Sequence, residues 1–214
     1  MSKVNVVVGM QYGDEGKGKL VDFLAAKADY VVRFQGGNNA GHTVVINGEP
    51  TVLHFIPSGA FNDNICVMGN GVVLDLEELQ KEVDMMEAKG VSLKNRFLIS
   101  ENAHLILPDD VEDSVNDKIG STGKGIAPAY TNKYAKTGLR VGDIINVEKN
   151  LDEFDIKARE KLLKFKDYLL KHSHLKPQIV NVSKVLNEAI DSGKARKKLN
   201  LLVQYSENRP PVEQ

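Results

Sequence analysis

Two carboxylates, Asp14 and Glu15, lie inside a glycine-rich segment, GMQYGDEGKGK, that follows a run of valines. Such a segment is typical of a phosphate-binding loop, where carboxylates and phosphates would repel each other strongly. The spacing differs from a Walker A loop, because six residues rather than four separate Gly9 from Gly16–Lys17, and Gly18 replaces the usual hydroxyl residue. The Mg²⁺ ligand must therefore come from elsewhere. Asp14 is the best candidate, because a hard dication prefers carboxylate and carbonyl oxygens and would cancel the repulsion.

The same segment can bind phosphate through its backbone and through one side chain. Its glycines let backbone amides approach anionic oxygens at the start of a helix, where each such interaction contributes about 0.3–1 kcal/mol. Lys17 adds a full positive charge. The segment therefore predicts phosphate binding, and the alternative interpretation is a glycine-rich turn with a solvated acidic tip.

A second polar motif, RFQGGNNAGHTVV, covers residues 33–45 and follows a predicted strand. Gln35, Asn38 and Asn39 can form hydrogen bonds to a base or a ribose. The carbonyl of Gly41 can approach a metal, and His42 can give or take a proton near neutral pH. Because open α/β sheets bind ligands at the carboxyl ends of their strands, we expect this motif beside the first. A structural role for His42 stays open, since a lone histidine is more often structural than catalytic.

A third glycine cluster, KIGSTGKGIAPAY at residues 118–130, offers two hydroxyls and two lysines to a second phosphate group. Two phosphate-binding segments are more than one nucleotide usually requires. The three segments together predict a reaction that joins a nucleoside triphosphate to a second phosphorylated partner, with Asp14 and His42 as base and acid. By contrast, His54 and His104 lie in apolar runs and are predicted to be interior groups.

Short β-branched runs and amphipathic helical patterns alternate along most of the chain. Strands are predicted at residues 4–9, 29–34, 64–75, 96–100 and 104–107, and helices at 17–28, 76–90, 153–175 and 183–193. We expect the first strand to be buried, and Leu20, Phe23 and Leu24 to line one face of the first helix. Asn47-Gly48 predicts a hairpin over 43–56. The alternation predicts an α/β fold with a mainly parallel sheet, flanking helices and a mixed edge at the hairpin.

The chain is predicted to have three parts. A nucleotide-binding α/β core with a P-loop-like segment covers 1–148, a helical segment covers 149–193, and a basic segment with a frayed tail covers 194–214.

Composition limits the classes of partner. The 214 residues carry 28 basic and 29 acidic side chains, so we expect small ligands rather than nucleic acid or an anionic membrane. Cys66 is the one cysteine, which allows no internal disulfide. No apolar run approaches the roughly 20 residues of a membrane span, and the start of the chain does not resemble a signal peptide. A cytoplasmic protein is therefore expected.

The motifs GDEGKGK, VVRFQGGNNAGHTVV, LHFIPSG, GNGVV, HLILP and IGSTGKGIAPAY…TGLRVGD closely resemble the adenylosuccinate synthetase family, in the same order, across about residues 4–147. The resemblance implies an enzyme that uses GTP and Mg²⁺ to couple inosine monophosphate (IMP) with L-aspartate, giving adenylosuccinate on the route to AMP. It also implies a homodimer.

The resemblance assigns roles to individual residues. Asp14 would take the proton from N1 of IMP so that its 6-oxygen attacks the γ-phosphorus of GTP, His42 would act as an acid toward that phosphoryl group, and Lys17 joins these two as catalytic. Asp14 and the carbonyl of Gly41 would hold Mg²⁺. The implied GTP-binding residues are Gly13, Asp14, Glu15, Gly16, Lys17, Gly18, Lys19, Gly41, His42 and Thr43. The implied IMP-binding residues are Asp14, Glu15, Gly16, Lys17, Asn39, Ala40, Gly41, His42, Thr122 and Lys136.

Two of the implied IMP-binding residues, Thr122 and Lys136, lie outside the first two motifs. Thr122 matches the threonine that contacts the IMP phosphate. Lys136 falls where the family commonly has an arginine that reaches into the neighbouring subunit, and lysine keeps the charge but lacks the bidentate fork.

The sequence also departs from the family's pattern. The segment DDVEDSVND is shorter than the family's connection, and ARKKLNLLVQYSENRPPVEQ replaces an apolar strand and a Gly-Ala-Gln-Gly loop. We therefore expect a fold that is incomplete relative to the family, and a truncated chain without activity of its own. The alternatives are a non-catalytic nucleotide-binding fragment that needs a second chain, a P-loop-type phosphotransferase, which the spacing disfavours, and a phage-type relative acting on a guanine nucleotide, against which Asp14 argues.

Overall fold

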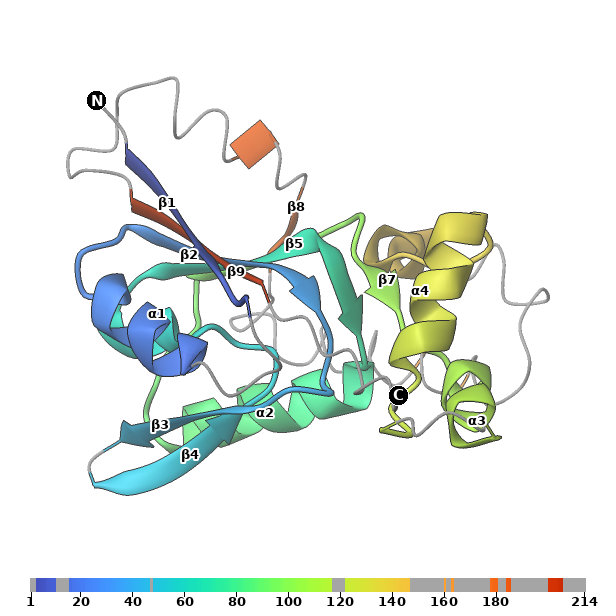
Figure 1. Ribbon diagram of the computed structural model, residues 1–214, viewed down its shortest axis with the longest axis horizontal. Helices are drawn as coiled ribbons and strands as arrows, with labels where there is room; N and C mark the ends of the chain where they lie inside the picture. Colours follow the sequence, from blue (N-terminus) through green and yellow to red (C-terminus); the bar gives the residue numbers. More distant parts are fainter. Residues whose placement is uncertain are drawn as a thin grey trace.

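The computed structural model describes residues 3–10, 16–46, 48–116, 122–146, 160, 163, 178–180, 184, 185 and 200–205. A seven-stranded sheet forms its centre (Figure 1). Its strands are β1 (Lys3–Val8), β2 (Tyr30–Gly36), β5 (Ile65–Leu74), β6 (Phe97–Ser100), β7 (His104–Leu105), β8 (Gln178–Val180) and β9 (Asn200–Tyr205). They follow the order β1-β9-β2-β5-β6-β8, with β7 beside β5, and every pair described in this sheet is parallel. The predicted α/β fold with a mainly parallel sheet is confirmed.

Two helices, α1 (Lys17–Ala25) and α2 (Leu76–Ala88), lie on the same side of the sheet (Figure 1). Beneath α2 the main core packs buried side chains of β5 and β6, such as Met68 and Phe97. Asp75 caps α2 by accepting hydrogen bonds from the backbone N–H groups of Glu77 and Glu78, and Gly90 follows the helix with φ +78°.

η1 (Ser58–Asn62) packs against α1, β2 and β5. α3 (Pro108–Asn116) and α4 (Ile126–Ala135) pack against each other, α4 contacts β7, and η2 (Val141–Asn146) contacts β6. Figure 1 shows α3 and α4 side by side beyond β7. The predicted strand at 104–107 is shorter than expected, because Pro108 begins α3 directly.

The hairpin predicted at Asn47-Gly48 is present, but its place is not the one expected. Strands β3 (His42–Ile46) and β4 (Glu49–Leu53) pair antiparallel, and Gly48 has φ +86°. They form a separate two-stranded sheet, so the predicted mixed edge of the main sheet is wrong. The reason is visible in the burial pattern, because Leu53 packs into the core while Val45 and Val52 face solvent.

Strand β9 was not expected from the sequence. Asn200–Tyr205 lies between β1 and β2 and pairs parallel with both. The expectation that this divergent segment, residues 194–214, contains no apolar strand is therefore wrong for Asn200–Tyr205. A strand paired on both sides needs only a short run such as NLLVQY, since its backbone groups are satisfied by two neighbours.

Burial at this end of the sheet also differs from the prediction. The first strand, expected to be buried, exposes Val4, Val6 and Val8 by 47, 60 and 50%, because the described residues leave this face of β1 largely uncovered. In α1 the buried residues are Val21 and Ala25, and Leu24 packs against them. Leu20 and Phe23 are exposed, so the predicted apolar face is wrong for these two residues. Among the described residues, the face of α1 that carries Leu20 and Phe23 is therefore not packed into a core.

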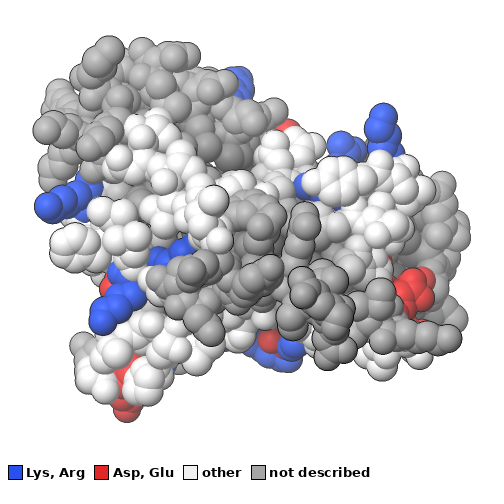
Figure 2. Space-filling view, viewed as in Figure 1, with Lys and Arg blue, Asp and Glu red and all other residues white. Residues whose placement is uncertain are grey.

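The helices predicted at 153–175 and 183–193 lie almost wholly outside the described residues; Glu160, Leu163, Lys184 and Val185 are helical. Among the described residues, no helix has the length and apolar character needed to cross a membrane. Lys and Arg side chains occur at several separate places on the face shown in Figure 2.

Candidate functional site

The start of α1 and the start of β3 meet at Gly18 and His42. A Cβ atom added to Gly18 would lie 2.7 Å from the Cβ of His42, which is closer than real Cβ contacts come. Gly16 precedes α1 with φ +73°, a conformation that favours glycine. The first two glycine motifs are therefore brought together, as the sequence predicts. Gly13, Asp14 and Glu15 lie outside the described residues.

The His42 side chain is largely withdrawn from water. Burial, together with the positive charges of Arg33 and His54, lowers the pKa of His42 to about 4. Its Nε2 atom is buried and has no hydrogen-bond partner among the described residues. At neutral pH the imidazole is therefore neutral and can donate or accept one hydrogen bond to a ligand, and an anionic group placed beside it would favour its charged form.

Polar atoms without partners gather in the segment between β2 and β3. Asn38 is 3% exposed, and within the part of the chain that the structure describes neither its amide oxygen nor its amide nitrogen has a hydrogen-bond partner. The amide oxygen of Asn39 is also buried and has no hydrogen-bond partner among these residues. Because burying unpaired polar groups is costly, such a concentration indicates a place where a polar ligand binds.

The two ends of this segment are tightly packed. A Cβ atom on Gly37 would meet the side chain of Ile126 and, at 3.2 Å, the backbone oxygen of Val73. A Cβ atom on Gly41 would lie 3.2 Å from Nε2 of His54. Close approach therefore requires glycine at position 37 and leaves little room for a side chain at position 41. His54, predicted to be an interior group, lies against the site.

The remaining predicted residues in this region surround the two motifs. Lys17 and Ala40 are partly buried, and Lys19 and Thr43 are exposed. Among the described residues, no group of three or more metal-binding side chains occurs. A Mg²⁺ ion held by one carboxylate, one carbonyl and nucleotide phosphates would not need such a group, since Mg²⁺ commonly uses few protein ligands.

Thr122 and Lys136 lie apart from each other. Thr122 precedes α4, and Lys136 follows it with φ +61°. Both side chains are exposed. A helix of 10 residues is roughly 15 Å long, so the two side chains do not meet at one phosphate within a single chain.

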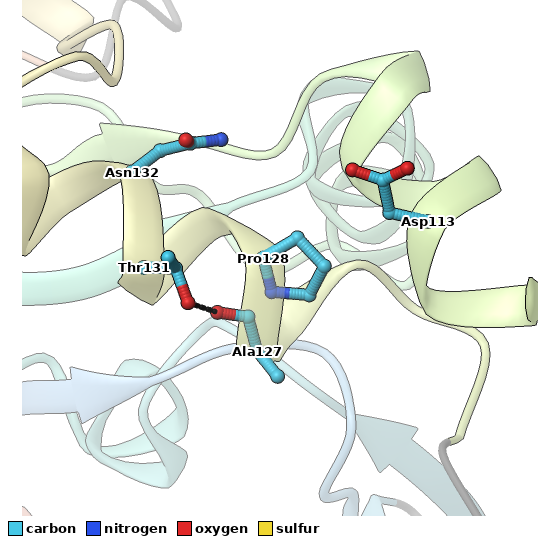
Figure 3. Close-up of a pocket in the computed structure, with 5 residues that line it drawn as sticks. All are labelled: Asp113, Ala127, Pro128, Thr131 and Asn132. Atoms are coloured by element: carbon cyan, nitrogen blue, oxygen red, sulfur yellow. Dashed lines mark hydrogen bonds between the residues drawn. The ribbon is translucent and has the colours of Figure 1, made fainter. Parts of the chain in front are cut away.

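A cavity of about 300 Å³ lies between α3 and α4, and none of the residues that line it belongs to the first two glycine motifs (Figure 3). It is lined by Asp113, Ala127, Pro128, Thr131 and Asn132. The hydroxyl of Thr131 donates to the Ala127 carbonyl at 3.1 Å, and the amide of Asn132 donates to Asp110 at 2.8 Å. Its polar lining is thus largely engaged by the protein itself.

The sequence reasoning missed Arg33 and Glu82. Arg33 is 7% exposed and Glu82 is 5% exposed, and both lie close to the 37–42 segment or to residues that touch it. The signal was present, because Arg33 interrupts the apolar strand YVVRF and Glu82 falls on the buried side of α2 beside Val83. A charged residue at a core position indicates a specific partner.

Comparison with known proteins is consistent with this arrangement. The family described as adenylosuccinate synthetase matches residues 6–204, a range that includes β9. The adenylosuccinate synthetase of Pseudoalteromonas atlantica is 50% identical over 198 residues, which are 89% of this chain and 44% of that protein.

Solved structures agree. A fully ligated adenylosuccinate synthetase from Plasmodium falciparum is 30% identical, with a TM-score of 0.77 over 94% of this chain and 51% of that one. A cyanophage S-2L succinoaminodeoxyadenylate synthetase gives a TM-score of 0.66 over 94% of this chain and 51% of that one, and at 20% identity its likeness shows the fold alone. The chain thus spans about half the length of the relatives that it matches.

Proposed function

Because the chain belongs to the adenylosuccinate synthetase family, we propose that it takes part in the GTP-dependent ligation of IMP and L-aspartate, giving adenylosuccinate, GDP and phosphate. The observation that carries this proposal is the close approach of Gly18 to His42, which joins the phosphate motif to the polar motif. The chain spans about half the length of its relatives. The step to which we assign Asp14, Lys17 and His42 is the transfer of the γ-phosphoryl group of GTP to IMP.

In this step Asp14 accepts the proton from N1 of IMP, and the 6-oxygen then attacks the γ-phosphorus while GDP leaves. The backbone N–H groups at the start of α1 and the Lys17 ammonium bind the phosphates of GTP. His42 is neutral at neutral pH, so it contacts the transferring phosphoryl group as a hydrogen-bond donor. Its buried Nε2, which has no partner, is the atom that we assign to this contact.

The same residues would hold a Mg²⁺ ion. Asp14 and the Gly41 carbonyl would supply the hard oxygen ligands that this ion prefers, together with phosphates of GTP. When bound, the ion neutralises charge on the phosphates and so removes the repulsion between them and Asp14.

Asn39, Ala40 and Gly41 form the border of the IMP site in this proposal, and Thr122 contacts the IMP phosphate. Lys136 lies at the opposite end of α4 from Thr122, which supports a contact of Lys136 with IMP in a neighbouring subunit of a homodimer. Lysine would supply charge there without bidentate geometry.

The proposal is tested by following adenylosuccinate absorbance with GTP, IMP, Mg²⁺ and L-aspartate. We expect no product from this chain alone, and product after addition of a polypeptide with the remaining C-terminal part of the Pseudoalteromonas atlantica relative. Positioning of substrates contributes roughly 7–11 kcal/mol to such reactions, so acid and base groups alone do not suffice. IMP binding by the mixture without any product would instead favour a non-catalytic nucleotide-binding chain.

Two variants test the assignment of Asp14 as a ligand of Mg²⁺. Asp14→Asn is expected to abolish Mg²⁺-dependent nucleotide binding, measured by calorimetry, because it removes the carboxylate ligand. Glu15→Gln is the matched control and should change binding little. Equal losses in both variants would contradict the assignment of Asp14.

A further inference from the structure

A buried cation and a buried anion flank the segment formed by residues 37–42. The guanidinium of Arg33 on β2 and the carboxylate of Glu82 on α2 are both almost completely removed from water. They lie near enough that each charge favours the ionised form of the other, although burial dominates and raises the pKa of Glu82. Burying charges is costly unless they form good hydrogen bonds, so the contacts of these two side chains indicate what they do.

Arg33 holds the first part of the segment. Its Nη2 atom donates to the backbone oxygen of Gly37 at 2.7 Å, and its Cζ lies 5.9 Å from the centre of the Phe55 ring. The preceding residue is fixed as well, because the N–H of Gly36 donates to the Tyr130 hydroxyl at 2.8 Å. The chain therefore leaves β2 in a fixed direction toward Asn38.

Glu82 acts on the other end of the segment through a neighbouring stretch of backbone. Its carboxylate accepts hydrogen bonds from the N–H groups of His54 at 3.0 Å, Phe55 at 3.0 Å and Ile56 at 2.7 Å. His54 in turn packs against Gly41, as the 3.2 Å approach of its Nε2 to an added Cβ shows. Glu82 thus fixes the backbone of His54, whose side chain lies against Gly41.

We propose that Arg33 and Glu82 are positioning residues, which together hold the 37–42 segment so that Asn39 and His42 face the ligand. Neither contacts the ligand itself. The ligand used below, IMP, rests on the proposed function, whereas the positioning of the segment does not depend on it.

Arg96 provides a control within the same chain. It also donates to backbone carbonyls, at 3.1 Å to Asn64 and 3.1 Å to Ala60, but these lie outside the 37–42 segment. A purely structural role would make Arg33 and Arg96 equivalent. A positioning role makes only Arg33 matter to the site.

The experiment compares Arg33→Met and Glu82→Gln with Arg96→Met and Glu77→Gln, the last an exposed residue of the same helix as Glu82. Backbone amide exchange over residues 37–43 is measured by mass spectrometry, and IMP affinity by calorimetry with Mg²⁺. We expect about tenfold faster exchange and about tenfold weaker IMP binding in the first pair, since each variant removes charge-assisted hydrogen bonds. The second pair should show neither change, even where Arg96→Met lowers the melting temperature.

Unchanged exchange over 37–43 in folded Arg33→Met and Glu82→Gln would overturn the proposal, as would equal acceleration in Arg96→Met. Where Arg33→Met or Glu82→Gln does not fold, Arg33→Lys and Glu82→Asp replace it, because each keeps the charge but alters the geometry of the hydrogen bonds. The same acceleration of exchange is expected of them, to a smaller extent, and its absence counts against the proposal. A parent chain that binds no IMP would contradict the proposed function, while the exchange measurement still decides the role of Arg33 and Glu82.

Discussion

The edge strand β1 and the central strand β5 of the seven-stranded sheet have similar compositions but different surroundings. Strand β5 contains Cys66, Val67 and Met68, all fully buried, while the valines of β1 alternate into solvent with Val6 at 60% exposure. Both runs are rich in β-branched residues, so their composition does not distinguish them. The difference shows that burial is set by what packs on the faces of a strand. Cys66 and Met68 of β5 pack in the main core with residues of α2, whereas the described residues leave the face of β1 that carries Val6 largely uncovered.

The candidate site lies between these two regions. The segment after β1 contains Asp14 and leads into α1, whereas the 37–42 segment is hydrogen-bonded to Arg33 and packs against residues held by Glu82. A buried region thus presents Asn39 and His42, and a less covered region presents the start of α1, to which we assign phosphate binding. Variants at matched positions can measure how different the two regions are.

The largest expected difference is between two phenylalanines. Phe97 on β6 is 1% exposed and Phe23 on α1 is 69% exposed. We expect Phe97→Ala to lower the free energy of unfolding by about 3–5 kcal/mol, because it leaves a cavity in the main core. Phe23→Ala should change it by less than about 0.5 kcal/mol. Urea denaturation measures both, and comparable losses would mean that the outer face of α1 is covered in solution.

The second prediction concerns pH, where the buried His42 differs from a histidine in water. Its pKa is lowered from 6.5 to about 4, so the fold favours the neutral form. The corresponding stability is present above pH 6.5 and is lost as the pH falls toward 4, by up to roughly 3 kcal/mol. Unfolding free energies of the parent and of His42→Asn, measured from pH 7 to 4.5, should therefore converge as the pH falls. Parallel pH dependences would show that His42 is accessible to protons in the fold.

Much of this arrangement can be predicted from the sequence, because local patterns determine it. The strand before Gly9, the Asn47-Gly48 turn and the helix after Asp75 each depend on a few neighbouring residues. The joining of two glycine motifs also follows from general rules, since parallel strands bring their carboxyl ends to one edge.

The remaining features depend on contacts between distant parts of the chain. The packing of α1 on Val7 and Val31 determines which face of the helix is buried. That face carries Val21 and Ala25, while the larger Leu20 and Phe23 are exposed. The insertion of β9 between β1 and β2 joins residues almost two hundred positions apart. Likewise, Glu82 reaches its three N–H partners across 26 to 28 residues of chain, a distance at which sequence patterns carry no information.

The smallest expected difference is also the most direct comparison of β5 with β1, because it makes the same substitution in both strands on one face of the sheet. Val67 on β5 packs with Val32 and Leu98, so Val67→Ala should cost about 2 kcal/mol through lost burial of two methyl groups and a small cavity. Val6→Ala on exposed β1 should cost less than about 0.5 kcal/mol. Urea denaturation at two protein concentrations measures both. A large cost for Val6→Ala that depends on protein concentration would show that the exposed valines of β1 are buried by a second polypeptide. β1 and β5 would then differ in what covers them and not in how tightly they are packed.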